Sequence, residues 1–332
     1  MPTPCRYSVI IPAHNAEASI TGAVRSVLDQ DFAGLEVIVI DDASADATAA
    51  RVEELDDPRV RLISFSTNRG VSAARNAGVE VARGEVVAFL DADDAHYPGF
   101  LAQTWAALDA GDDVDAVVVG RTVRTDAPGA AHPRYASAAP HTRGVVSGCE
   151  ALSAVLTDHL TPFPWDKAVR RTLLGTRPFP EGIARFEDLV TMGLVLSRAR
   201  RVRVLPAPLI EYRVSGGSLT WGRVPERSER DAALGFLAES LGPARSRALA
   251  RQVATLECLM TVLIAQAAVL HEDQARLAAA RRDLSLRLLT SALLTNRTIG
   301  GAGIVARFLP SLFRALIRRR TRATYGASIE HS

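Results

Sequence analysis

The sequence predicts an α/β fold in which a doubly wound sheet is followed by a helical region. Short apolar runs alternate with helical patterns over the first hundred residues, the runs at 36–40 and 86–90 are almost entirely apolar, and turn residues separate the runs. Runs that are apolar throughout are typical of parallel strands covered on both faces. Alternation at this spacing indicates right-handed strand–helix–strand crossovers. Ligands should therefore bind at the edge formed by the carboxyl ends of these strands.

The predicted elements follow one another in a regular order. Apolar runs predict strands at residues 7–11, 36–40, 60–64 and 86–90. Apolar side chains three and four positions apart predict helices at residues 16–30, 44–55 and 71–82. Ser44 is expected to cap the second of these helices. Further along, prolines at positions 128, 133 and 140 disfavour regular structure, so residues 125–142 are expected to form a loop.

Composition and charge limit the classes of function. The chain has 39 basic and 37 acidic residues, a net charge of +2, which gives no global field for nucleic acid, and we expect no nucleic-acid partner. Cys5, Cys149 and Cys258 are far apart and lack the spacing of a zinc site or a disulfide framework. Free thiols fit a reducing, cytoplasmic setting.

Polar residues follow three of the predicted strands. Residues 12–15 come after the first strand, Asp41 and Asp42 after the second, and residues 91–94, which include three aspartates, after the fourth. Carboxylates gathered at one edge of a sheet repel one another unless a cation or hydrogen-bond donors lie between them. A hard divalent cation that accepts carboxylate and phosphate oxygens is the natural partner.

Seven sequence blocks carry a resemblance to a known family. Four resemble the nucleotide-sugar half of family 2 glycosyltransferases, which have the GT-A fold, a Rossmann-like, doubly wound mixed sheet: VIIPAHN (9–15), VIDDASADAT (39–48), NRGVSAARNAG (68–78) and GEVVAFLDADD (84–94). Three resemble its acceptor side: PWDKAVRRTLL (164–174), FPEGIARFEDLVTMGLVL (179–196) and EYRVSGGSLT (211–220).

The resemblance, which covers roughly residues 6–220, implies a domain organisation. It predicts a GT-A domain at residues 1–220, with nucleotide-sugar binding in 1–120 and the acceptor side in 121–220. Residues 221–332 are predicted to form a helical C-terminal region.

The resemblance also implies a donor site. Asp42 should hold a uracil base, Arg75 should contact the nucleotide, and Arg213 should act as a lid residue near the diphosphate, with the Gly216–Gly217 pair as its hinge. The base pocket should be lined by Pro12, His14 and Asn15. His14 stands where the family usually has tyrosine. Alternative interpretations are a turn or helix cap for Asp42, a surface histidine for His14, a surface salt bridge for Arg75, and a helix-start role for Asp46.

The triplet Asp91-Ala92-Asp93 matches the family's DxD motif. The resemblance implies that Asp91 contacts the ribose and the water shell of a metal ion, and that Asp93 ligates the metal, Mn²⁺ or Mg²⁺. Such an ion would stabilise the charge that develops on the departing diphosphate. The alternative is an acidic turn without a ligand.

Asp188 of the Glu187-Asp188 pair matches the family's catalytic base. A carboxylate at a helix N-terminus can accept the proton of an attacking hydroxyl. One base without a second nucleophile implies a single displacement with inversion. The alternative for this pair is ordinary helix capping. Nearby, Trp165 could stack on a sugar or be a core indole, and Lys167 could reach a phosphate or fix the helix that bears the base.

These features predict an inverting, metal-dependent glycosyltransferase. It would move a sugar from a nucleoside-diphosphate donor, UDP-linked by resemblance, to a hydroxyl of a glycan, a lipid-linked acceptor or a small molecule. A nucleotidyltransferase of related fold would need a basic glycine-rich loop after the first strand, which residues 12–15 lack. A non-catalytic nucleotide- or glycan-binding scaffold would need no base.

The C-terminal region is predicted to be helical at residues 226–241, 244–270, 274–294 and 303–322. Residues 253–270 approach the length of a membrane span, but they include Glu257, so we expect a buried bundle helix or a homo-oligomer interface. Residues 303–322 alternate apolar residues with arginines. Such a helix can contact an anionic membrane or dock on the catalytic domain. The protein is expected in the cytoplasm, either free or at the inner face of the membrane.

Overall fold

The computed structural model describes residues 5–111, 113–125, 134–138, 141–214, 223–243 and 246–325. The chain divides into two compact units. The α/β unit comprises Met1–Val123, Ala136–Leu152 and Leu160–Tyr212. The helical unit comprises Arg124–Tyr135, Ser153–His159 and Arg213–Ser332.

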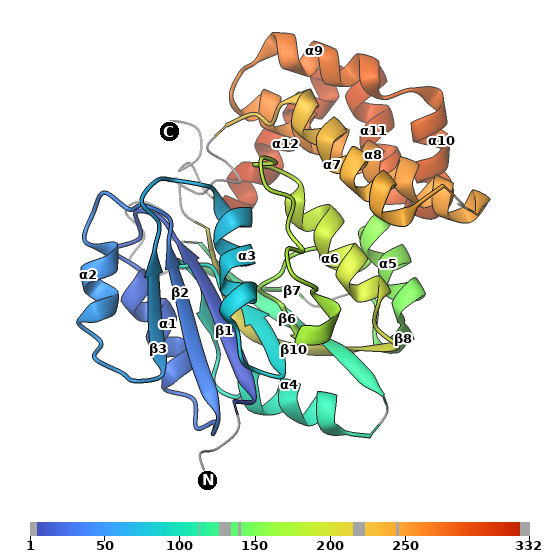
Figure 1. Cartoon of the computed structure of the whole chain (residues 1–332). Helices are drawn as coiled ribbons and strands as arrows, with labels where there is room; N and C mark the ends of the chain where they lie inside the picture. Colours follow the sequence, from blue (N-terminus) through green and yellow to red (C-terminus); the bar gives the residue numbers. More distant parts are fainter. Residues whose placement is uncertain are drawn as a thin grey trace. The chain divides into compact units, whose positions relative to one another are not determined.

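The described residues form a ten-stranded sheet (Figure 1). Its strands are β1 (Tyr7–Ala13), β2 (Leu35–Asp41), β3 (Val60–Ser64), β4 (Val86–Phe89), β5 (Ala95–His96), β6 (Val114–Thr125), β7 (Arg134–Ala138), β8 (Gly144–Ser147), β9 (Lys167–Arg170) and β10 (Arg201–Val214). The order along the sheet is β3-β2-β1-β4-β9-β6-β10-β5, with β7 paired to β6 and β8 to β10. β1 to β4 pair in parallel, whereas β9 pairs antiparallel with both β4 and β6, so the sheet is mixed.

The sheet is flanked by helices, the first three of which lie within the segments that apolar spacing predicted. They are α1 (Ile20–Leu28), α2 (Thr48–Glu53), α3 (Val71–Val81), α4 (Phe100–Asp109), α5 (Gly148–Leu156), α6 (Glu187–Ser197) and a 3₁₀ turn at Arg171–Leu173. The predicted start of the second helix at residue 44 was wrong, and so was Ser44 as its cap. The Ser44 hydroxyl instead accepts the N–H of Asn15 (2.9 Å), and Asp46 accepts the N–H of Thr48 (3.0 Å) at the true start.

Both faces of β1, β2 and β4 are buried, as their apolar runs predicted, whereas β3 is partly exposed. On β1, Tyr7, Val9 and Ile11 belong to the core shared with α1 and α4, and the Tyr7 hydroxyl bonds to Thr104 (2.9 Å). Ile10 points to the opposite face, where a Cβ at Gly78 of α3 would lie 2.3 Å from its Cγ2. Glycine at this position therefore lets α3 approach the sheet closely. Figure 1 shows α1 and α3 on opposite faces.

One predicted loop contains a strand. Within residues 125–142, β7 occupies Arg134–Ala138 between Pro133 and Pro140. Because neither proline lies inside the strand, neither removes a ladder donor from it. Residues 126–133 and 139–140 of the predicted loop lie outside the described residues.

The helical unit contains α7 (Arg227–Leu241), α8 (Arg247–Leu270), α9 (Gln274–Asp283), α10 (Leu286–Thr295), α11 (Arg297–Phe308) and α12 (Pro310–Tyr325). α8 is central and contacts the other five. Within the described residues it is the one helix long and apolar enough to cross a membrane, and 61% of its apolar window is buried. The expectation of a buried bundle helix is therefore confirmed.

Two predicted helices are each divided in the structure. The helix expected at 274–294 ends at Asp283, and the Ser285 hydroxyl caps α10 by accepting the N–H of Leu288 (3.3 Å). The helix expected at 303–322 is interrupted at Leu309, and Pro310 begins α12. Proline suits a first helical position and breaks a helix that precedes it.

Candidate active site

The carboxyl ends of β1, β2 and β4 lie at one edge of the sheet because these strands are parallel. Beside this edge Arg75 of α3 connects three segments that are far apart in the sequence. Its Nη1 donates to Asp188 Oδ1 (2.7 Å) and lies 3.6 Å from Glu187 Oε1, and its Nη2 donates to Asp91 Oδ1 (3.1 Å). We call these four residues the Arg75 cluster.

The Arg75 cluster is largely removed from solvent. The side chain of Arg75 is 3% exposed, against 19% for Asp188 and 31% for Asp91. Burial raises the pKa of Glu187, and repulsion by Asp188 adds to that effect. Burial also raises the pKa of Asp188, while Arg75 opposes the rise. One buried guanidinium therefore keeps two partly exposed carboxylates at fixed positions.

The backbone at the start of α6 aims the acidic pair. Phe186, immediately before Glu187, has a φ of 68°, in the left-handed region that a bulky side chain rarely adopts. The preceding segment is fixed by Asn76, whose side chain donates to the Phe179 carbonyl (2.8 Å) and accepts its N–H (3.0 Å). Neither Phe186 nor Asn76 was predicted from the sequence as part of the site, although Asn76 directly follows Arg75. Consecutive residues of α3 thus hold the base candidate and the chain that leads to it.

The predicted base-pocket residues form a second group at the same edge. The His14 Nδ1 donates to the Asp42 carbonyl (2.8 Å), because a carbonyl can only accept, and Nε2 then accepts from Asn15 Nδ2 (3.2 Å). The ring is exposed, whereas Pro12 is buried inside β1. This arrangement leaves a face of the imidazole at the surface of the strand end.

Asp42 has a definite structural task. Its two carboxylate oxygens accept the N–H groups of Arg69 (2.7 Å) and Gly70 (2.8 Å), at the start of α3. Asp42 is therefore a capping residue, as one interpretation predicted. It caps the start of α3, the helix that bears Arg75, and not the turn that follows Asp42. Each oxygen keeps a further lone pair for a ligand N–H.

Asp91 retains a carboxylate oxygen that could contribute to a metal site together with other ligands. Arg75 uses one oxygen of Asp91 and leaves the other. Among the described residues no group of three or more histidine, cysteine, aspartate or glutamate side chains could hold a metal ion. One or two carboxylates, completed by phosphates and water, is the usual set for Mg²⁺ and also suits Mn²⁺.

Two residues of the first acceptor-side block, Trp165 and Lys167, are packed inside the α/β unit. Trp165 is sandwiched between Phe163 (4.9 Å, 8°) and Tyr212 (5.1 Å, 9°), so neither face of the indole is open to a sugar and the core interpretation holds. The Lys167 ammonium donates to the Thr161 carbonyl (2.7 Å), the Phe163 carbonyl (2.8 Å) and Asp166 (2.5 Å). Those three bonds use all its donors, so it fixes this loop rather than reaching a phosphate.

The remaining predicted residues are Arg213 and the Gly216–Gly217 pair. Arg213 is near the end of β10, in the part of the strand assigned to the helical unit. Gly216 and Gly217 lie outside the described residues. The lid role of this segment stays a prediction.

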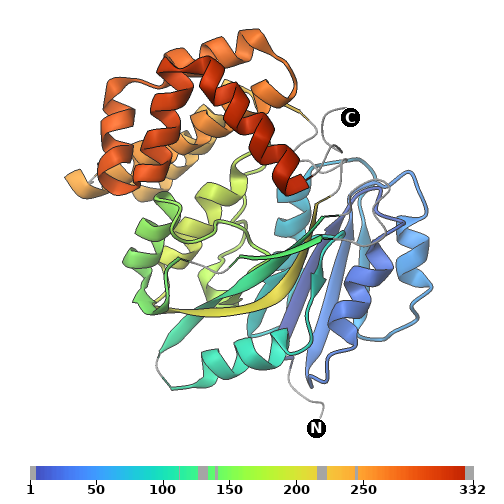
Figure 2. The same cartoon turned by 180° about the vertical axis from the view of Figure 1, so that it is seen from behind.

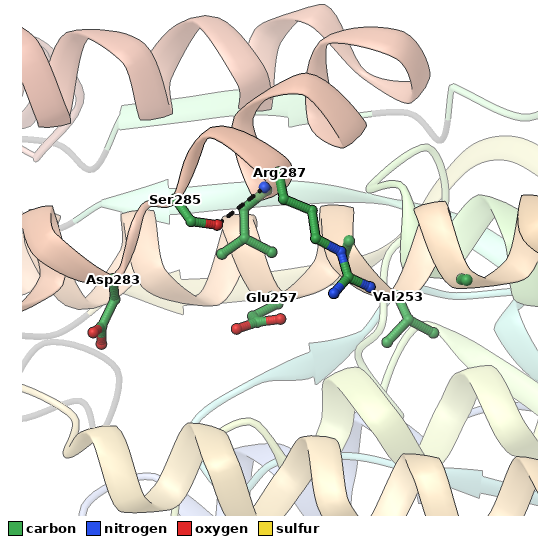
Figure 3. A pocket seen from close by; sticks show the side chains of 8 residues that line it. Val253, Glu257, Asp283, Ser285 and Arg287 are labelled. Carbon is green, nitrogen blue, oxygen red and sulfur yellow. Dashed lines mark hydrogen bonds between the residues drawn. The ribbon is translucent and has the colours of Figure 1, made fainter.

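A cavity of about 260 Å³ lies in the helical unit between α8 and the α9–α10 turn (Figure 3). It is bordered by Ala250, Val253, Ala254, Glu257, Asp283, Ser285, Arg287 and Leu288. The sequence pointed to none of these residues as a site. Asp283 forms ion pairs with Arg227 (3.0 Å) and Arg230 (3.1 Å), so its carboxylate beside the cavity has a structural role.

The chain is similar to known proteins. Residues 8–164 match the family described as Glycosyl transferase family 2. The succinoglycan biosynthesis protein ExoO of Rhizobium meliloti is 43% identical over 122 residues, covering 35% of this chain and 35% of ExoO. The putative glycosyltransferase EpsH of Bacillus subtilis is 28% identical over 225 residues, covering 66% and 63%.

A third relative carries a more specific name. The Escherichia coli protein WfgD, a UDP-Glc:alpha-D-GlcNAc-diphosphoundecaprenol beta-1,3-glucosyltransferase, is 41% identical over 87 residues, covering 26% of this chain and 34% of WfgD. The chain therefore spans about a third of ExoO and WfgD and somewhat under two thirds of EpsH.

Solved structures resemble the whole chain. Residues 1–349 of S. aureus TarS align with a TM-score of 0.65 at 19% identity, covering 96% of this chain and 92% of that 1–349 chain. The complex of the same protein with UDP-GlcNAc aligns with a TM-score of 0.63. At this identity the likeness concerns the fold, and it confirms the predicted GT-A architecture with a C-terminal helical region.

Proposed function

We propose that the protein is a glycosyltransferase that moves a sugar from a UDP-sugar to a hydroxyl acceptor, since residues 8–164 match glycosyl transferase family 2. The observation that carries the proposal is the Arg75 cluster, in which one guanidinium joins Asp188, the base candidate, to Asp91 of the DxD triplet. A scaffold that only bound a nucleotide would have no use for a carboxylate placed in this way.

Asp188 is the proposed catalytic base. It lies in the first turn of α6, and its raised pKa brings its proton affinity closer to what accepting a hydroxyl proton near neutral pH requires. The contact with Arg75 favours the ionised form that a base must have at the start. The acceptor oxygen, as it loses this proton, attacks the anomeric carbon, and the nucleoside diphosphate leaves from the opposite side with inversion.

The donor is proposed to lie along the edge formed by β1, β2 and β4, within residues 1–120, with the acceptor on the side of residues 121–220. Asp42, His14 and Asn15 would hold the base, with Pro12 beneath them. Arg75 would contact the nucleotide and Arg213 the diphosphate. A UDP-linked donor is supported by WfgD, named as a UDP-Glc transferase, and by TarS, crystallised with UDP-GlcNAc.

Asp93, with Asp91, would hold Mn²⁺ or Mg²⁺ when the donor binds. Such an ion, when bound, supplies a Lewis acid for the diphosphate leaving group. The chain's own contribution is to present the carboxylates, since Arg75 fixes the Asp91 side chain.

The acceptor and the cellular setting are proposed more broadly. WfgD acts by its name on a diphosphoundecaprenol-linked sugar, and ExoO is named for succinoglycan biosynthesis, which favours polysaccharide biosynthesis on a glycan or lipid-linked acceptor. Cys5, Cys149 and Cys258 are free thiols, which suits a cytoplasmic enzyme. Its place there would be free or at the inner face of the membrane.

The test is a donor screen in two steps. Calorimetry with UDP, with and without Mn²⁺, should show binding that strengthens with the ion and that weakens in Asp93→Ala. A coupled assay for released nucleoside diphosphate should then identify the UDP-sugar that turns over. Binding without turnover for every donor and acceptor class would favour a scaffold, and release of pyrophosphate from a nucleoside triphosphate would favour a nucleotidyltransferase.

A further inference from the structure

Exposed apolar side chains are concentrated in the helical unit. Of the nine large hydrophobic side chains exposed in the described part of the chain, eight belong to this unit. Four of these flank the junction of α11 and α12: Phe308 (56% exposed), Leu309 (50%), Leu312 (47%) and Leu316 (47%). Isolated exposed leucines are common on protein surfaces, but a contiguous group calls for an explanation.

α12 is apolar on two of its faces. Phe313 and Ile317, four positions apart, are buried inside the helical unit, where α12 contacts α8 and α11. Leu312 and Leu316, also four positions apart, form a separate row that is exposed. Burial inside the unit therefore accounts for the first row and not for the second. Figure 2 shows α12, in red, at the surface of the unit.

The charge around this row is of one sign. Residues 284–329 contain eight arginines and no aspartate or glutamate. Because the whole chain has a net charge of +2, the other residues together carry −6. Arg314 and Arg318 reach back to Gln274 and Glu272 of the same unit, whereas Arg319 and Arg320 are exposed and make no ion pair with any described residue.

We propose that the basic apolar face, formed by Phe308, Leu309, Leu312, Leu316, Arg319 and Arg320, docks on an anionic lipid bilayer. Its leucine and phenylalanine side chains enter the boundary between headgroups and acyl chains, while the two arginines contact lipid phosphates. A second copy of the chain fits this face less well, because a symmetric contact would place arginines opposite arginines. Nucleic acid would leave the apolar centre of the face uncovered.

Vesicle binding by the full-length chain, without donor, tests the proposal independently of the transfer reaction. We expect cosedimentation with phosphatidylcholine vesicles that contain about one third phosphatidylglycerol, and little with phosphatidylcholine alone. Added salt should weaken the binding, because it screens the arginine contribution. Equal binding to both kinds of vesicle, or no binding to either, would overturn the proposal.

Paired variants separate the two contributions. Arg319→Gln with Arg320→Gln should weaken anionic-vesicle binding roughly 25-fold, at about fivefold for each charge, while Arg51→Gln with Arg61→Gln, exposed arginines of the α/β unit, should not. Leu312→Ser with Leu316→Ser should weaken it roughly tenfold, while Val145→Ser, an exposed side chain of β8, should not.

Folding and self-association are controlled in the same proteins. All variants change exposed side chains, so their melting temperatures should stay within a few degrees of the native value. Sedimentation velocity supports the proposal if the native chain and the leucine variant have the same mass. If the native chain is a dimer that Leu312→Ser with Leu316→Ser dissociates, the face is an interface between copies and the membrane proposal is wrong.

Discussion

The Arg75 cluster of the α/β unit and the basic apolar face of the helical unit use charge in opposite ways. In the α/β unit, Arg75 and Lys167 are buried, and each donates to carboxylates or carbonyls. In the helical unit, Arg319 and Arg320 extend from an exposed apolar row. Burying a charge costs free energy unless partners of opposite charge or polar groups are fixed beside it, so the first arrangement fixes the positions of its side chains. In the second arrangement the arginines are exposed and can bind a partner outside the chain.

The largest expected effect lies in the α/β unit, at Asp188. Asp188→Asn keeps the size of the side chain and an oxygen for Arg75 but cannot accept a proton. We expect kcat to fall by about 10² to 10⁴, with UDP-sugar affinity, measured by calorimetry, close to native. Glu187→Gln changes the adjacent carboxylate, which lies farther from Arg75, and should lower kcat much less. If the two variants are equally active, Asp188 is not the base.

Arg75 tests whether the cluster is held by its buried charge. Replacement by methionine removes the partner of three carboxylates and should lower the free energy of unfolding by about 3–5 kcal/mol, measured by urea denaturation. Arg75→Lys should recover only part of this loss, because one ammonium lacks the fork that spans Asp188 and Asp91. Arg51→Met, which removes an exposed pair with Glu54, should change stability by about 0.5 kcal/mol or less. Equal effects at the two arginines would contradict the comparison.

The elements of the α/β unit were largely predictable because their signals are local. Runs such as 37–40 and 86–90 are apolar over the length of one strand, and the aspartates that follow them mark the strand ends. The contact of Arg75 with Asp188 could not be predicted in the same way. It joins α3 to α6 across 113 residues, and only packing decides which charges meet. The wrong helix start at Ser44 has a similar cause, since Asn15 of another loop binds its hydroxyl.

In the helical unit the sequence does contain signals for the helix boundaries, but the predictions from apolar spacing did not use them. Ser285 and Pro310 are residues that typically begin helices, and each lies inside a segment that apolar spacing alone had joined into one helix. Asn296 likewise caps α11 through the N–H of Thr298 (3.0 Å). Capping residues therefore locate helix boundaries that apolar spacing cannot. The exposed row on α12 could be recognised only once the structure showed which of its apolar residues are buried.

His96 gives a pH test of burial in the α/β unit. It is buried and stacked on Phe100 (3.8 Å), and burial lowers its pKa to about 3. The unfolded chain binds a proton at His96 below about pH 6.5, which the folded chain does not, so this residue makes stability rise with pH between about 3 and 6.5. We expect His96 to account for about 2 kcal/mol of stability lost between pH 7 and pH 5.

The contribution of His96 is isolated by comparing urea denaturation of the native chain with His96→Leu at both pH values. Carboxylates titrate equally in the two proteins, so their effects cancel. The variant should lose about 2 kcal/mol less than the native chain on acidification. The same pH dependence in both proteins would mean that His96 is protonated in the folded state.

The smallest effect concerns two neighbouring glycines of α11 in the helical unit. A Cβ at Gly301 meets nothing within 4 Å, so Gly301→Ala should stabilise the protein by about 0.5–1 kcal/mol through helix propensity. A Cβ at Gly300 would lie 2.6 Å from the backbone nitrogen of Leu293, which cannot move without shifting α10, so Gly300→Ala should destabilise it by about 1 kcal/mol or more. Thermal unfolding measures both. Opposite signs at adjacent positions would show that α10 and α11 are in close backbone contact, and stabilisation by both alanines would show that the helical unit is looser than the α/β unit.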